Sequence, residues 1–245
     1  MDISLQLYSI KEEAAERFEQ ALELTEKAGY QGVEFAGYFG KTSEQMKALL
    51  NQHHLKPVST HVGLQRLQEG LDEELEYAKQ LGYNLIICPY SSCETKGQTL
   101  EDAKFLETCA QKAAKKGIII GYHNHAHEFK QFDGKYALDI LLEAAPTVKF
   151  EPDLYWIALG EADPVQYIAP LAKAGRICAI HAKELAKTGR DNVYIGQGKI
   201  DFLAIAKMCP PSVYPWILEQ EEFTSDHYDG IAQSRQGLQR IFERL

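Results

Sequence analysis

Four apolar segments of the sequence end in a histidine or a carboxylate. The residues at these ends are His123, Asp153, His181 and Glu219. A strand in a protein core has no structural need to end in such a side chain, and imidazole together with carboxylate is a ligand set for a borderline or hard divalent cation. We therefore predict a metal site made of these four residues. A polar pocket without a metal, or a chance pattern, is the alternative.

The four ends can meet at one point if the segments are neighbouring parallel strands of a barrel. Short apolar runs alternate with longer amphipathic stretches, in eight strand-then-helix units of about 31 residues each. The runs span residues 3–8, 32–36, 57–61, 84–90, 117–125, 148–153, 177–181 and 214–219. They lack a polar alternate face, as expected of parallel strands that are buried on both sides. We predict an α/β fold with a single (β/α)8 TIM barrel over residues 1–245. A doubly wound open sheet competes, but no GxGxxG motif follows the first strand.

Local signals mark the ends of the expected helices. Thr99 and Asp102 resemble a capping box, and Asp163 followed by Pro164 predicts the first turn of another helix. A glycine, the residue that most often ends a helix, follows four of the helical patterns at positions 29, 82, 117 and 175.

Reacting groups of a TIM barrel lie at the carboxyl ends of its strands and in the loops that follow. The polar and aromatic residues at the other strand ends should therefore line the same pocket. We expect the substrate to contact Gln6, Tyr8, His61, His125 and Trp156. The aromatic rings can form stacking walls, although ordinary packing is the alternative for each ring alone. The turn Gly196–Gly198 either binds a phosphate or hydroxyl group or is a tight loop before a helix capped by Asp201, and the second reading is slightly favoured.

Charge and cysteine content restrict the partners and the compartment. Lys and Arg number 26 against 35 Asp and Glu, a net charge of −9. Because the basic residues do not cluster, we expect no nucleic-acid partner and no anionic membrane partner. Five cysteines without a CxxC motif indicate reduced thiols, and we find neither a signal-peptide pattern nor an apolar run long enough to span a membrane. We therefore expect a cytoplasmic protein.

Several segments together resemble the xylose-isomerase-like TIM-barrel superfamily, and more narrowly its sugar phosphate isomerase/epimerase family. The most specific are Gly121–His125 (GYHNH) with Glu128-Phe129, and His181–Lys183 (HAK). Further matching segments are Leu5–Ser9, Gly32–Glu34, Ser59–His61, Glu151–Trp156, Gly196–Gly198 and Leu218–Gln220. The resemblance covers nearly the whole chain.

The resemblance implies one divalent ion, commonly manganese, held by Glu, Asp, His and Glu at the ends of adjacent strands. Asp153, His181 and Glu219 match three of these ligands, whereas His123 stands where much of the superfamily has Glu. We expect manganese, with zinc, magnesium or cobalt as alternatives. The expected partner is a small-molecule carbohydrate, and the expected assembly is a homodimer or homotetramer.

The resemblance also implies a reaction. We expect an isomerase or epimerase that acts on a sugar, keto-sugar or sugar phosphate through proton transfer beside a carbonyl, with the metal polarising adjacent C=O and OH groups. Glu219 is expected to be both a ligand and the base. Because His123 cannot act as a second carboxylate, His125, Glu128 or Lys183 should supply the second acid or base. A dehydratase, lyase or hydrolase acting on a keto-sugar or inositol derivative, or a non-catalytic carbohydrate-binding barrel, is the alternative.

Overall fold

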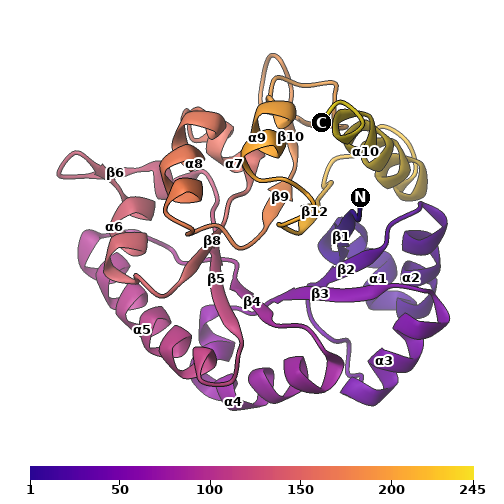
Figure 1. Cartoon of the computed structure of the whole chain (residues 1–245), viewed down its shortest axis with the longest axis horizontal. Helices are drawn as coiled ribbons and strands as arrows, with labels where there is room; N and C mark the ends of the chain where they lie inside the picture. The colour runs from indigo at the N-terminus through magenta and orange to yellow at the C-terminus, as the bar shows by residue number, and fades with distance from the viewer.

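Eight parallel strands curl into a barrel at the centre of the computed structural model, which describes all 245 residues (Figure 1). Their order is β8-β5-β4-β3-β2-β1-β12-β9. The strands are β1 (Ser4–Gln6), β2 (Gly32–Phe35), β3 (Lys56–His61), β4 (Leu85–Cys88), β5 (Ile119–His123), β8 (Lys149–Glu151), β9 (Ile180–Ala182) and β12 (Trp216–Leu218). Parallel bridges from Phe150 to Ile177 and from Asp153 to His181 join the two ends of this order. The predicted TIM barrel is confirmed.

Ten α-helices surround the barrel (Figure 1). They are α1 (Lys11–Glu16), α2 (Phe18–Lys27), α3 (Ser43–Gln52), α4 (Leu64–Leu81), α5 (Lys96–Ala114), α6 (Ala137–Ala144), α7 (Leu154–Leu159), α8 (Pro164–Lys173), α9 (Phe202–Met208) and α10 (His227–Phe242). Asp163 caps α8 as predicted, and the four glycines predicted at helix ends all have positive φ. The capping box at Thr99 is wrong, because α5 begins earlier with Thr95 as its N-cap and Thr99 lies inside the helix.

Four short elements were not predicted. Two 3-10 turns were among them: η1 (Leu7–Ile10) follows β1 directly, and η2 (His127–Phe129) follows β5 after a short loop. Two antiparallel hairpins lie outside the barrel sheet, one of β6 (Gln131–Phe132) with β7 (Lys135–Tyr136) and one of β10 (Glu184–Leu185) with β11 (Asn192–Val193). Strands of two residues are too short to show a period in the sequence.

The strand period of two divides the barrel interior into an apolar layer and a polar layer above it. The apolar layer contains Leu85, Ile87, Ala179 and Ile217, with Val58 and Cys178 packed against them. Gly121 provides the space for this layer, because a Cβ atom there would lie 2.4 Å from Ile87 Cδ1. Two residues further along β5, β9 and β12 come His123, His181 and Glu219. The same alternation that fills the barrel therefore delivers polar side chains to its mouth.

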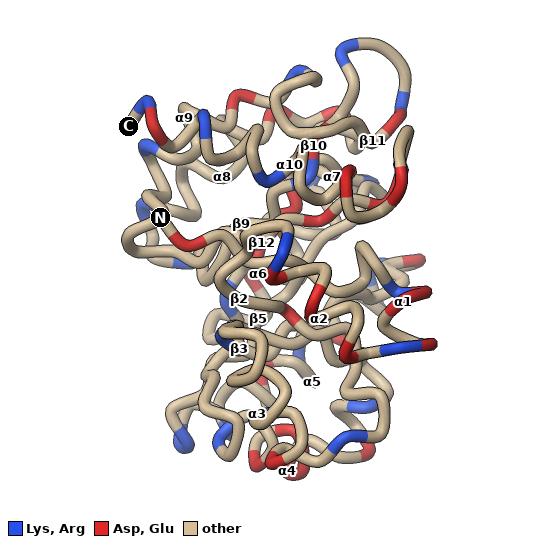
Figure 2. The backbone as a smooth tube through the Cα atoms, turned by 90° about the vertical axis from the view of Figure 1, so that its right-hand side faces the viewer, with Lys and Arg blue, Asp and Glu red and all other residues tan.

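Charges of both signs are spread over the molecule. Figure 2 shows Lys and Arg interspersed with Asp and Glu along the chain, without a continuous basic stripe. Ion pairs such as Lys112–Asp72 and Lys135–Glu143 join neighbouring elements of the surface. No helix has both the length and the apolar character needed to cross a membrane.

Candidate active site

Asp153, His181 and Glu219 converge at the carboxyl ends of their strands. His181 Nδ1 lies 3.2 Å from Asp153 Oδ2 and 3.6 Å from Glu219 Oε2, and one ligand atom of each residue lies within 4.8 Å of the others. Zinc–nitrogen and zinc–oxygen bonds of about 2.0–2.2 Å keep two ligands of one ion within roughly 4.4 Å of each other. The two distances from His181 are inside this limit. All three side chains are buried, so this group can hold a divalent ion.

His123, the fourth predicted ligand, belongs to an adjoining group of side chains. This group consists of His61, His123, Glu151 and His181, so that His181 is shared by both. His123 Nδ1 lies 3.4 Å from Glu151 Oε2 without hydrogen-bond geometry, and it is a buried nitrogen with no hydrogen-bond partner. Burial, reinforced by the charges of His181 and His61, lowers the pKa of His123 well below its usual value. A neutral imidazole with a free nitrogen is suited to bind a metal.

Glu34 supports His181 from the side opposite to Asp153. His181 Nε2 lies 3.1 Å from Glu34 Oε1. A proton on Nε2 that is donated to Glu34 leaves the lone pair of Nδ1 directed at the two carboxylate ligands, which is how outer-shell carboxylates commonly orient a metal-binding histidine. Gln6 Nε2 donates to Glu34 Oε1 at 2.7 Å and Ser59 Oγ donates to Glu34 Oε2 at 2.5 Å. The carboxylate of Glu34 is therefore fixed on every side.

His61 bridges two buried carboxylates, those of Glu34 and Glu151. Its Nε2 atom lies 3.0 Å from Glu34 Oε1 and 3.0 Å from Glu151 Oε2. Burial alone would lower the pKa of His61, but the charges of Glu34 and Glu151 raise it to about 10. Burial, together with the charge of Glu34, raises the pKa of Glu151 to about 7. The imidazole thus serves as the cation of a buried network and carries no unpaired positive charge.

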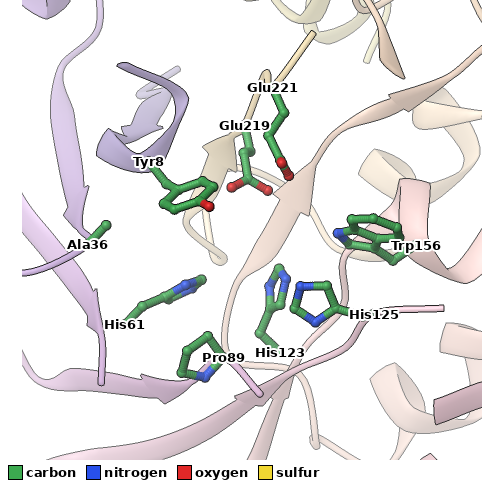
Figure 3. Close-up of a pocket in the computed structure, with 9 residues that line it drawn as sticks. All are labelled: Tyr8, Ala36, His61, Pro89, His123, His125, Trp156, Glu219 and Glu221. Carbon is green, nitrogen blue, oxygen red and sulfur yellow. The ribbon is translucent and has the colours of Figure 1, made fainter. Parts of the chain in front are cut away.

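A cavity of about 330 Å³ opens above these groups (Figure 3). It is lined by Tyr8, Ala36, His61, Pro89, His123, His125, Trp156, Glu219 and Glu221. Four of the five predicted substrate contacts therefore lie on it. The fifth, Gln6, does not, because it is fully buried and its amide is bound to Glu34.

Lys183 adds a buried ammonium group to this site. Its Nζ atom lies 3.4 Å from Glu219 Oε2 and also pairs with Glu221. The same atom stands over the rings of Tyr155 and Trp156, 4.9 and 4.7 Å from their centroids. Burial alone would lower the pKa of Lys183, but the nearby carboxylates raise it above its usual value. Sequence reasoning missed Glu221, although it lies two residues after Glu219 and the strand period could have indicated it.

Glu128, predicted as a catalytic residue, does not line the cavity. Its carboxylate accepts hydrogen bonds from Tyr122 Oη and from the backbone N–H of His125, each at 2.8 Å. Burial raises the pKa of Glu128. These contacts fix the turn that carries His125, so the structure gives Glu128 a positioning role.

The turn Gly196–Gly198 is occupied from within the protein. The carboxylate of Glu184 accepts the backbone N–H groups of Gly196 at 3.3 Å and Ile200 at 3.1 Å. A Cβ atom on Gly198 would lie 2.1 Å from the backbone oxygen of Leu185. Asp201 caps α9, which confirms the tight-loop reading of this segment.

The comparison with protein families agrees with this barrel and its polar mouth. The model of the xylose isomerase-like TIM barrel family matches residues 22–243. The chain belongs to this family. No curated protein matches it significantly in sequence.

Solved structures of similar fold cover almost the whole of this xylose isomerase-like barrel. A sugar phosphate isomerase/epimerase from Parabacteroides distasonis is 22% identical, with a TM-score of 0.83 over 97% of this chain and 93% of that chain. An L-ribulose 3-epimerase is 16% identical, with a TM-score of 0.74 over 100% of this chain and 95% of that chain. The IOLI protein, solved with a zinc atom, is 15% identical, with a TM-score of 0.73 over 100% of this chain and 99% of that chain. At these identities the likeness establishes the fold.

Glu34→Gln is expected to weaken divalent-metal binding by about 10–100-fold, the usual loss when an outer-shell partner of a metal-binding histidine is changed. The amide cannot match the charged acceptor that now faces His181 Nε2. Titration calorimetry with manganese and with zinc measures the affinity. Glu184→Gln is the matched control, because it also neutralises a buried carboxylate but has no contact with His181. Equal metal affinity of Glu34→Gln and the wild type would show that Glu34 does not orient His181.

Proposed function

We propose that the protein is a divalent-metal-dependent isomerase or epimerase that acts on a sugar, keto-sugar or sugar phosphate through proton transfer beside a carbonyl. The observation that carries this proposal is the convergence of Asp153, His181 and Glu219, of which Glu219 also lines the cavity. The family and the epimerases among its structural neighbours support it.

The residues at the site fit a divalent ion. Asp153, His181 and Glu219 would hold it, and the unpartnered nitrogen of His123 makes that residue the candidate for a fourth ligand. Carboxylate and imidazole without thiolate suit manganese, with zinc, magnesium and cobalt as alternatives. Such an ion, when bound, polarises carbonyl and hydroxyl oxygens and so eases removal of a proton from the adjacent carbon.

The chain itself supplies the groups that move and hold protons. Glu219 lines the cavity and is the proposed base at the substrate carbon. Lys183, predicted as a catalytic residue, is buried and does not line the cavity, so its proposed role is to position Glu219 and Glu221 through its two ion pairs. Burial lowers the pKa of His125 to about 4, so its ring contributes as a neutral partner for substrate hydroxyl groups.

Exchange of substrate hydrogen with solvent tests the proposed reaction. Manganese-loaded protein is incubated in D2O with a panel of keto-sugars and keto-sugar phosphates, and deuterium at the carbons beside the carbonyl is measured by NMR. We expect incorporation in at least one substrate. Sugar binding without incorporation would contradict the proposal and favour a carbohydrate-binding barrel. Release of water or of a glycosidic group would favour a dehydratase, lyase or hydrolase.

The remaining expectations are part of the same proposal. We place the protein in the cytoplasm, in keeping with five cysteines that are all free of disulfide bonds. Its partner is a small carbohydrate and neither a nucleic acid nor a membrane. A homodimer or homotetramer is the proposed assembly, which light scattering of the purified protein can test.

A further inference from the structure

Positive charge at the cavity is already neutralised by the protein. None of the nine lining residues is Lys or Arg, and two of them are Glu. The buried ammonium of Lys183 lies between Glu219 and Glu221. The His61 ring lies between the carboxylates of Glu34 and Glu151. Apart from a metal ion held by Asp153, His181 and Glu219, the cavity therefore offers a bound phosphate group carboxylates and no side-chain cation that is free to balance it.

The backbone of the turn Gly196–Gly198, a predicted candidate for phosphate binding, does not replace the missing side-chain cation. Two backbone N–H groups of this turn, those of Gly196 and Ile200, already donate to Glu184. The carboxylate of Glu184 stands where an anionic ligand of the turn would have to lie. An external phosphate would first have to displace a buried side chain of the protein.

Two polar nitrogen atoms in the cavity wall have no partner within the protein. Trp156 Nε1 and His125 Nδ1 are buried, and neither makes a hydrogen bond. Both residues line the cavity, and Figure 3 shows the indole nitrogen on the edge of Trp156 that faces it. Buried polar atoms of native proteins nearly always have a partner. A hydroxyl group of a bound molecule can satisfy each of these nitrogens without bringing a charge.

We propose that the cavity binds an uncharged polyhydroxy carbonyl compound, a free keto-sugar or a similar neutral sugar derivative, in preference to a sugar phosphate. This inference rests on the proposed function of the same cavity and narrows its substrate class. Trp156 Nε1 and His125 Nδ1 are the proposed contacts to sugar hydroxyl groups. The exposed ammonium of Lys11 lies 4.2 Å from the centroid of the ring of Tyr8, which lines the cavity. If a phosphate binds instead, this ammonium at the rim is its proposed site.

Paired ligands test this preference. D-fructose with D-fructose 6-phosphate, and D-ribulose with D-ribulose 5-phosphate, are compared on manganese-loaded protein by titration calorimetry and by deuterium incorporation. We expect the uncharged member of a pair to bind at least about 10-fold more tightly. Tighter binding of the phosphates, lost in Lys11→Ala, would overturn the inference and place the phosphate at the rim. Binding of an uncharged sugar without deuterium incorporation would contradict the proposed reaction but leave the substrate class standing.

A variant that removes one carboxylate charge distinguishes an effect of the cavity from a general effect of the protein's net charge. In Glu221→Gln the ammonium of Lys183 loses one of its two carboxylate partners, so the preference for the uncharged sugar should fall several-fold. Glu101→Gln makes the same change of charge at an exposed position on α5 and should leave the preference unchanged. An unaltered preference in Glu221→Gln would show that the carboxylates of the cavity do not exclude phosphate.

Discussion

His181→Ala is expected to abolish binding of a divalent ion. Its imidazole provides the atom that lies between the carboxylates of Asp153 and Glu219, and its other nitrogen is held by Glu34. Losing a direct ligand should cost more affinity than the roughly 10–100-fold that is typical of an outer-shell change. Elemental analysis of protein purified with added manganese or zinc measures the bound metal.

The control for this loss is a second histidine-to-alanine change. His53, the C-cap residue of α3, pairs with Glu26 at 3.1 Å and belongs to none of the candidate metal groups, so His53→Ala should keep the full metal content. Removal of His181 leaves buried carboxylates without their partner, which can destabilise the fold. His181→Asn, with circular dichroism and thermal unfolding, separates loss of metal from loss of structure. Equal metal content in the folded variants and the wild type would place the ligands elsewhere.

The barrel could be predicted because the sequence pattern of a strand followed by a helix is repeated along the whole chain. Each strand is an apolar run followed by a helix, and the glycines that end four helices all adopt the positive φ that this role requires. Asp153, His181 and Glu219 could be found for the same reason. They are polar residues at strand ends where packing alone would favour apolar ones.

The partners of these residues could not be predicted from the sequence. His181 and Glu34 are 147 residues apart, and their contact depends on how the sheet closes. The register between β2 and β3 shifts at Val33/Glu34, where Val33 pairs with Pro57 and Glu34 with Ser59. A one-residue shift decides which side chain faces the interior, and periodicity does not reveal it.

Glu128 shows how a local turn defeats a strand-based argument. Glu128 follows shortly after the fifth apolar run, residues 117–125, and a position so near a strand end predicts a side chain in the mouth of the barrel. The 3-10 turn η2 instead returns the chain on itself, and Glu128 binds the backbone N–H of His125 and the hydroxyl of Tyr122. Its side chain therefore supports the site from outside the cavity.

Glu219→Gln is expected to lower the rate of proton exchange by about 10²–10⁴-fold, the contribution usually made by a positioned acid or base. Glu219 is the carboxylate that both lines the cavity and belongs to the group of three candidate ligands. An amide cannot accept the substrate proton, but its oxygen can still coordinate a metal weakly, so part of the metal should remain bound. The measurement is the rate of deuterium incorporation into a keto-sugar that the wild type exchanges, at matched metal occupancy.

Glu221→Gln is the matched comparison for this prediction, because Glu221 lines the same cavity and pairs with the same Lys183 but is not among the three candidate ligands. If Glu219 is the base, Glu221→Gln should retain most of the exchange rate on an uncharged keto-sugar, since it removes a neighbouring charge and leaves the proton acceptor in place. Undiminished exchange in Glu219→Gln, with metal bound, would mean that another residue takes the proton. Glu221, the other carboxylate on the cavity wall, would be the next candidate, and if it is the base the effects of the two variants would be reversed.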